Sequence, residues 1–271
     1  MVENLTVSEW IRDREIHGMT TFSYEDVVGA FSSMSSQVVR NNLSRLTKQK
    51  VISSVYKGFY VIIPTQYVLS GVVPEIYYIE YLMKYLGRPY YISLLNAAEQ
   101  YGAAHQRSQA FSVTTTLPKI NKVRNGSSNL TFMFRKDIPE QFLQTRNSET
   151  GVITFSNPEL TAADLVQYNK RIGGLSRATT VLAELVEYTD FATIDSAFVE
   201  YVSQASIQRL GYILDEILGE RVQADVLYQK ARELGLKFSP APLSALCGRT
   251  GFVTDKKWKV VINAEIEADD V

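Results

Sequence analysis

The sequence is poor in the side chains that build disulfides and metal sites. Its 271 residues include one cysteine, Cys247, and two histidines, His17 and His105. A single cysteine cannot form an internal disulfide, and so few soft ligands do not support a structural zinc site. We therefore expect neither a metal nor another cofactor.

The motifs that carry catalytic chemistry are also missing. There is no P-loop pattern, no glycine signature of dinucleotide binding after a strand, no HExxH and no GxSxG. Glu265 and Glu267 alternate near the C-terminus as in some nuclease metal sites, but no matching Asp and Lys stand at a recognisable spacing, and a solvated strand face explains them better. We expect no catalytic residues and no enzyme.

Long apolar runs are absent as well. The first residues, MVENLTVSEWIRDREIHG, lack the apolar core of a signal peptide, and no later run reaches the roughly 18 to 20 residues of a membrane span. We expect a cytoplasmic protein. With 45% hydrophobic and 21% charged residues the chain should fold, and with a net charge of −1 any attraction to nucleic acid must come from local patches.

One such patch is a stretch without acidic residues. Residues 31–60 contain no Asp or Glu, although acidic residues occur freely before them. The stretch holds five basic residues: Arg40, Arg45, Lys48, Lys50 and Lys57. A phosphate backbone is a partner that such a local charge would attract.

The acid-free stretch begins with an amphipathic helix expected at 36–49, capped by Ser35 or Ser36. Val39, Leu43 and Leu46 form its apolar stripe. The opposite stripe carries side chains that read base edges or hold phosphates, namely Gln37, Arg40, Asn41, Ser44 and Lys48. Such a face is often merely solvated, so the neighbouring elements have to decide between the two interpretations.

Those neighbours favour DNA binding. A first helix capped by Thr6 or Ser8 ends near Gly18, and a second begins after Ser23. After the third helix, residues 51–63 alternate as two strands joined by a turn at Lys57 and Gly58. Three helices followed by a hairpin indicate a winged helix-turn-helix, with Lys57 at the tip of the wing.

The remainder predicts a larger mixed domain, so the fold class is α+β. Tyrosine-rich helices are expected within 74–104, strands mainly within 109–155 and at 258–267, and helices through most of 160–235. We expect two domains: a winged helix-turn-helix at 1–68 and a mixed α/β domain at 69–271, mostly helical in its second half. The tyrosines should mainly pack in cores or interfaces.

A second basic region lies within 107–146. It contains two acidic residues, Asp137 and Glu140, and seven basic ones: Arg107, Lys119, Lys122, Arg124, Arg135, Lys136 and Arg146. It could extend a DNA footprint, bind another acidic surface, or be a solvated face.

Taken together, several segments resemble one family. They are the N-terminal helices and hairpin, YYISLLNAAEQYGAAHQRSQAFSVTT, ITFSNPELTAADLVQYNKRIGGLSRATTVLAEL and PLSALCGRTGFVTDKKWKVVINAEIE. In order and extent they are similar to the AbiEi-type antitoxins of abortive-infection toxin-antitoxin systems.

The resemblance implies a transcriptional regulator of a type IV toxin-antitoxin system. Such a protein represses its own operon by binding inverted repeats in the promoter, and its C-terminal domain counteracts a nucleotidyltransferase-like toxin. In this chain the reading of DNA would fall on Ser36, Gln37, Arg40, Asn41, Ser44 and Lys48, with Tyr56 and Lys57 in the wing. Arg45, Lys50 and Lys57 would hold phosphates. No motif assigns the antitoxic role, and direct contact with the toxin is left open.

Two alternatives remain at this stage. The winged helix could mediate protein contacts in an adaptor, or the tyrosine-rich middle and helical half could form a nuclease. Weak, equal binding to promoter and random DNA would favour the first, and metal-dependent cleavage the second.

Overall fold

The computed structural model describes residues 5–104, 108–120, 129–248 and 250–266. The chain is 46% helical and 18% strand, so the fold is mixed α+β, as predicted at that level. Contacts divide it into two compact units. The first comprises Met1–Tyr91, Gln109–Ile138 and Thr145–Thr154, and the second comprises Ile92–Ser108, Pro139–Gln144 and Phe155–Val271. The expected domain boundary at residue 68 stays a prediction.

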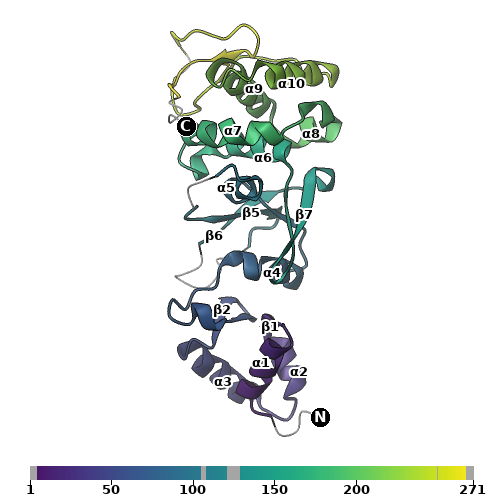
Figure 1. The fold of residues 1–271 in the computed structure, drawn as a ribbon, viewed down its shortest axis with the longest axis vertical. Coiled ribbons are helices and arrows are strands. Elements are labelled where there is room, and N and C mark those ends of the chain that lie inside the picture. The colour runs from purple at the N-terminus through teal and green to yellow at the C-terminus, as the bar shows by residue number, and fades with distance from the viewer. Residues whose placement is uncertain (1–4, 105–107, 121–128, 249, 267–271) are drawn as a thin grey trace. The chain divides into compact units, whose positions relative to one another are not determined.

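The N-terminal part of the first unit is built from three helices and a small sheet (Figure 1). The elements are α1 (Val7–Ile16), β1 (Thr21–Ser23), α2 (Tyr24–Ala30), α3 (Ser36–Lys48), β2 (Ile52–Tyr56) and β3 (Phe59–Ile62). The sheet has the order β1-β3-β2, and both pairings are antiparallel. Strand β1 was not expected, because its three residues are too few to show an alternating pattern and depend on pairing with β3.

The three helices begin at side-chain caps that the sequence indicates. Thr6 and Ser23 each form a reciprocal capping box, with Glu9 and Asp26 respectively. The hydroxyl of Ser35 accepts a hydrogen bond from the backbone N–H of Val38. These caps satisfy donors that the first turn of a helix leaves unpaired, and they set the start of each helix.

The tyrosine-rich segment up to Tyr91 belongs to the first unit. Within the range 74–104, where helices were expected, a 3₁₀ turn (Glu75–Tyr77) precedes the short helix α4 (Ile79–Tyr85). The hydroxyl of Tyr77 donates to Glu149 Oε2 at 2.6 Å, and that of Tyr81 donates to the backbone oxygen of Thr150. Their phenols therefore hold the turn that follows residue 148.

The largest sheet has five strands in the order β6-β5-β4-β8-β7. Its strands are β4 (Tyr90–Ile92), β5 (Phe111–Thr116), β6 (Leu130–Arg135), β7 (Leu143–Ser148) and β8 (Gly151–Ser156). β5 and β6 pair in parallel from Phe111↔Leu130 to Thr116↔Arg135. Strands β5, β6 and β7 fall within the expected range 109–155, and β8 ends one residue beyond it, whereas β4 lies within 74–104, for which helices were expected. The sequence of β7, LQTRNS, is polar and shows no strand pattern by itself.

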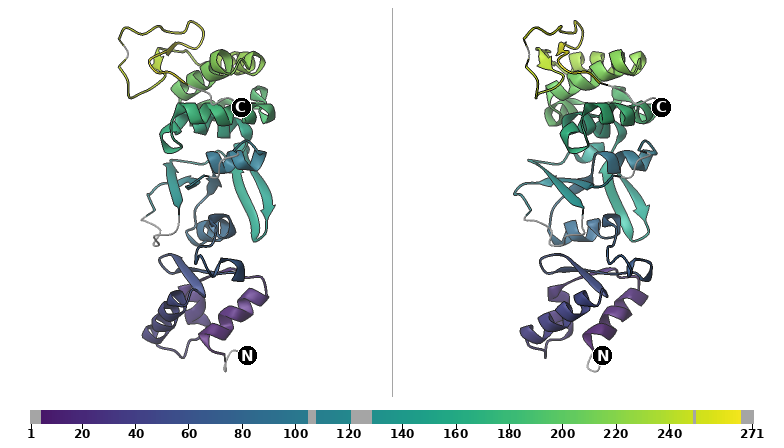
Figure 2. Two further views of the ribbon diagram at one scale, coloured as in Figure 1. Left: turned by 60° about the vertical axis from the view of Figure 1, so that its left-hand side comes forward. Right: turned by 90° about the vertical axis from the view of Figure 1, so that its left-hand side faces the viewer.

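Helices dominate the second unit, as expected for 160–235. They are α5 (Leu95–Ala98), α6 (Pro158–Gln167), α7 (Leu175–Leu185), α8 (Ser196–Tyr201), α9 (Gln204–Tyr212) and α10 (Arg221–Glu233). In the two views of Figure 2, α6 lies beside α7 and α9 beside α10, in agreement with their contacts. No helix in the described residues is long and apolar enough to cross a membrane.

The expected C-terminal strand at 258–267 is wrong in extent. Among the described residues 258–266, only Val260–Val261 (β10) is strand, and it pairs in parallel with Ala241–Pro242 (β9). The strand stops because the Asn263 amide turns to the loop before it, donating to the carbonyls of Ser244, Cys247 and Gly248. Glu267 lies outside the described residues.

Trp258 anchors this C-terminal segment. Its ring is fully buried, and its indole N–H donates to Asp215 Oδ2 at 3.0 Å. Lys257 Nζ bonds the same oxygen at 2.7 Å. Burial opposes the charge of Asp215, but these hydrogen bonds outweigh it and its pKa lies below the ordinary value. Asp215 sits in a π-helical turn (Ile213–Ile217) that directly follows α9.

We predict that Gly211→Ala destabilises the protein by about 1–3 kcal/mol, the usual range for overpacking a core. A Cβ at Gly211 would lie 2.1 Å from ring atoms of Trp258, and the ring is held by Asp215. Gly29→Ala is the matched control, because Gly29 is helical and has open space around it. It should stabilise by about 0.5–1 kcal/mol. Urea unfolding measures both, and equal effects would contradict the packing argument.

A second prediction concerns Glu159 in α6, which is 5% exposed. Burial raises the pKa of its carboxyl, although the backbone N–H of Asp190, at 2.7 Å, acts in the opposite direction. The folded state therefore binds this proton more tightly than the unfolded state. This contribution to stability is complete below the ordinary pKa and is lost as pH rises through the folded value.

Glu159→Gln removes this titration. The unfolding free energy of the variant relative to the natural protein should therefore increase between acidic and neutral pH. Denaturant titrations at both pH values measure the difference, with Glu140→Gln at an exposed position as the control. A difference that does not change with pH would refute the assignment.

Candidate nucleic-acid interface

The side chains predicted to read DNA lie together on α3. Val39, Leu43 and Leu46 are buried in the N-terminal core. The remaining surface of the helix exposes the candidates Ser36, Gln37, Arg40, Asn41, Ser44, Arg45 and Lys48. Gln37 Nε2 donates to Asn41 Oδ1 at 2.9 Å, so these two amides are aligned one turn apart on the exposed face.

The charge on this face is not neutralised locally. Within the described ranges, Arg40, Arg45 and Lys48 form no ion pair with an acidic side chain. An exposed cluster of one sign without counter-charges raises the local potential and attracts a polyanion. The arrangement is therefore suited to holding phosphates.

Arg40 has an aromatic neighbour on α2. Its guanidinium carbon lies 5.8 Å from the ring centre of Tyr24, within the range of a cation–π contact. Tyr60, on β3, is in the same region: burial raises the pKa of its phenol, and Tyr24 and Glu25 add to the shift. These aromatic neighbours restrict the orientations of the Arg40 side chain. The sequence did not reveal them.

The hairpin turn is held by α4. Lys57 is exposed and Tyr56 half-buried, and Gly58 has φ +76°. The hydroxyl of Tyr85 donates to the backbone oxygen of Lys57 at 3.3 Å, and the rings of Phe59 and Tyr85 lie 5.3 Å apart. The Lys57 side chain thus projects from an anchored turn.

Lys50 differs from the other candidate cations. It lies two residues beyond α3 with φ +55°, and its Nζ donates to the backbone oxygen of Leu69 at 3.1 Å. An ammonium has three donors, so this bond occupies one of them.

One residue of this face was missed by the sequence argument. Val38 is 44% exposed on α3, next to Gln37 and one turn before Asn42, whose amide donates to the Val38 carbonyl. The sequence argument placed Val38 in neither stripe of the helix. Its offset from the buried stripe of Val39 was the available signal.

The second basic region is only partly described. Arg107, Lys122 and Arg124, and also His105, lie outside the described residues. Lys119, Lys136 and Arg146 are exposed, and Arg135, which is half-buried at the end of β6, and Arg146 each have interaction partners. The three interpretations of this region stay open.

No metal-binding cluster accompanies these surfaces in the described ranges. There, no group of three or more His, Cys, Asp or Glu side chains is placed to hold a metal ion.

One protein family is similar to the central part of the chain. Residues 91–216 match the family model described as the AbiEi antitoxin C-terminal domain. This part of the chain is therefore similar to a domain of antitoxins, a regulatory kind of protein whose family implies a toxin partner. Over residues 91–216, this match confirms the resemblance to the AbiEi antitoxins that was inferred from the sequence.

A solved structure shares the fold over most of the chain. The crystal structure of the RV2827C protein from Mycobacterium tuberculosis is similar with a TM-score of 0.65 and 14% sequence identity, covering 94% of this chain and 89% of that one. At this identity the likeness concerns the fold alone. No curated protein matches the sequence.

Proposed function

We propose that this protein is the antitoxin and transcriptional autorepressor of a type IV abortive-infection system, and that its N-terminal module binds double-stranded DNA. The observation that carries the DNA-binding part is the exposed, acid-free face of α3, where Arg40, Arg45 and Lys48 have no ion-pair partner among the described residues.

The arrangement around α3 supports a winged helix-turn-helix. Helices α2 and α3 follow each other closely, and the hairpin β2–β3 follows α3 and pairs with β1. In such a module the helix after the turn enters the major groove and the hairpin contacts the backbone or the minor groove. We propose that the module occupies residues 1–68 and that 69–271 form the antitoxin domain.

The proposed roles follow from side-chain chemistry. The amides of Gln37 and Asn41 suit adenine edges, and Arg40 suits guanine. The hydroxyls of Ser36 and Ser44 serve either bases or phosphates. Phosphate contacts fall to Arg45, Lys48 and Lys50, with Tyr56 and Lys57 acting from the hairpin.

The antitoxin part of the proposal rests on the family of residues 91–216. We propose that the toxin is a nucleotidyltransferase-like protein and that the DNA target is an inverted repeat in the protein's own promoter. A dimer or two adjacent monomers could occupy such a repeat.

We predict that Asn41→Ala weakens promoter binding by about 1–3 kcal/mol and relaxes specificity at one base position. Arg40→Ala should behave similarly. Arg12→Ala, an exposed cation on α1, is the matched control and should change binding little. Gel-shift titrations of the full chain against promoter and scrambled DNA at matched salt measure these effects.

The salt dependence gives a second readout of the same experiment. With about four to five phosphates neutralised, log K should fall by roughly four per tenfold rise in salt, and Arg45→Ala should reduce this slope by about one. Equal, weak binding to both DNAs would refute the repressor and favour a protein-interaction adaptor.

A separate prediction concerns Val38. If α3 enters the major groove, the exposed side chain of Val38 is suited to the methyl group of a thymine. Replacing that thymine with deoxyuridine removes one methyl and should weaken binding by about 0.8 kcal/mol. With Val38→Ala the same replacement should have little effect. As a control, a thymine outside the DNA segment that the protein covers is replaced in the same way. If the replacement weakens binding of Val38→Ala as much as it weakens binding of the natural protein, the contact is excluded.

A further inference from the structure

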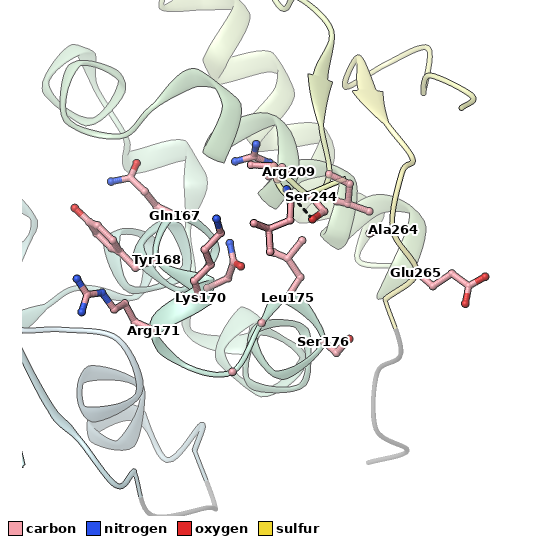
Figure 3. A pocket seen from close by; sticks show the side chains of 16 residues that line it. Gln167, Tyr168, Lys170, Arg171, Leu175, Ser176, Arg209, Ser244, Ala264 and Glu265 are labelled. Carbon is pink, nitrogen blue, oxygen red and sulfur yellow. Dashed lines mark hydrogen bonds between the residues drawn. The ribbon is translucent and has the colours of Figure 1, made fainter. Parts of the chain in front are cut away.

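The second unit contains a pocket of about 800 Å³ that the proposed function does not use (Figure 3). It lies where the chain leaves α6 and enters α7, and Arg209 of α9 and two C-terminal segments, 243–246 and 264–265, complete its lining. Its size falls within the usual range for small-molecule sites, roughly 300–1,000 Å³.

The charged side chains of the lining are mainly cationic. Lys170, Arg171 and Arg209 line the pocket, and among the described residues Glu265 is the one acidic side chain in the lining. Figure 3 shows Lys170 and Arg209 extending towards the same part of the pocket, whereas Arg171 and the Glu265 carboxylate point away from it. Lys170 has no ion-pair partner among the described residues.

Arg209 is held in place for this role. Its Nε donates to the backbone oxygen of Pro242 at 2.8 Å, which fixes the plane of the guanidinium. An oriented guanidinium can form paired hydrogen bonds with phosphate oxygens, and an ammonium adds a point charge.

The pocket walls on either side of these two cations are apolar or lack side chains. Gly173 and Gly174 adopt φ of +104° and +110°, which side chains rarely allow, and the Gly174 N–H bonds the carbonyl of Asn169 at 2.9 Å. Leu175, Leu243 and Leu246 provide apolar surface, and Leu246 is 78% exposed. A leucine this exposed at the edge of a pocket can cover an apolar ligand group.

From these features we infer that the pocket binds a nucleotide. The phosphates would lie at Lys170 and Arg209, and the base and sugar against the leucines and the glycine turn. A ligand with one anionic end and one flat, largely apolar end matches this division of the lining. The inference does not depend on DNA binding by α3, since all lining residues belong to the second unit.

Isothermal titration calorimetry of the full chain tests the inference. The titrants are ATP, GTP, CTP and UTP, with adenosine and inorganic phosphate as partial ligands, all at one ionic strength. At least one nucleotide should bind, and adenosine and phosphate should each bind about tenfold more weakly or worse. Absence of binding by all four nucleotides at millimolar concentration would overturn the inference, and so would phosphate binding as tightly as the nucleotides.

Variants locate the binding. Lys170→Ala and Arg209→Gln should each weaken nucleotide binding about tenfold or more. Arg171→Ala removes an equal charge from the same turn, but that side chain points away, so affinity should stay within about twofold. Lys170 is exposed and its replacement should not disturb folding, which a thermal melt checks. If Lys170→Ala and Arg171→Ala weakened nucleotide binding equally, the effect would be one of overall positive charge, and the proposed site would be refuted.

Discussion

Burial of Val39, Leu43 and Leu46 against the N-terminal core determines what α3 presents to solvent. Because three positions of one stripe are packed against α1, α2 and β2, the helix cannot rotate without exposing them. The polar and cationic side chains of the opposite stripe are therefore held outward as a set. The proposed DNA-binding surface follows from this packing.

Tyrosines extend this organisation through the first unit. A phenol can pack its ring against apolar neighbours while its hydroxyl satisfies a backbone or carboxylate oxygen. The hydroxyls of Tyr77 and Tyr81 hold the turn after β7, and the hydroxyl of Tyr85 holds the hairpin turn at Lys57. The tyrosine-rich segment thus stabilises loops and the hairpin that short strands alone would leave weakly fixed.

The second unit has a different centre. Trp258 occupies the space that Gly211 leaves open, and Asp215 bonds both its indole and Lys257. This attaches a C-terminal segment, which lies beyond the region matched by the antitoxin family, to helix α9 within that region. The nucleotide pocket that we infer is lined by the same two parts of the chain, so packing of the C-terminal segment is required to complete it.

The sequence by itself determined the helices of the N-terminal module, their caps and the outward stripe of α3, because helical periodicity and capping depend on residues three or four apart. It also carried the resemblance to the antitoxin family, through the order of extended segments. Strands β1, β4 and β7 and the short extent of β10 could not be predicted, since each depends on a partner distant in sequence. The same reason applies to the neighbours of Arg40, the anchoring of the hairpin by Tyr85, and the meeting of Lys170 with Arg209: only the tertiary structure brings these side chains together.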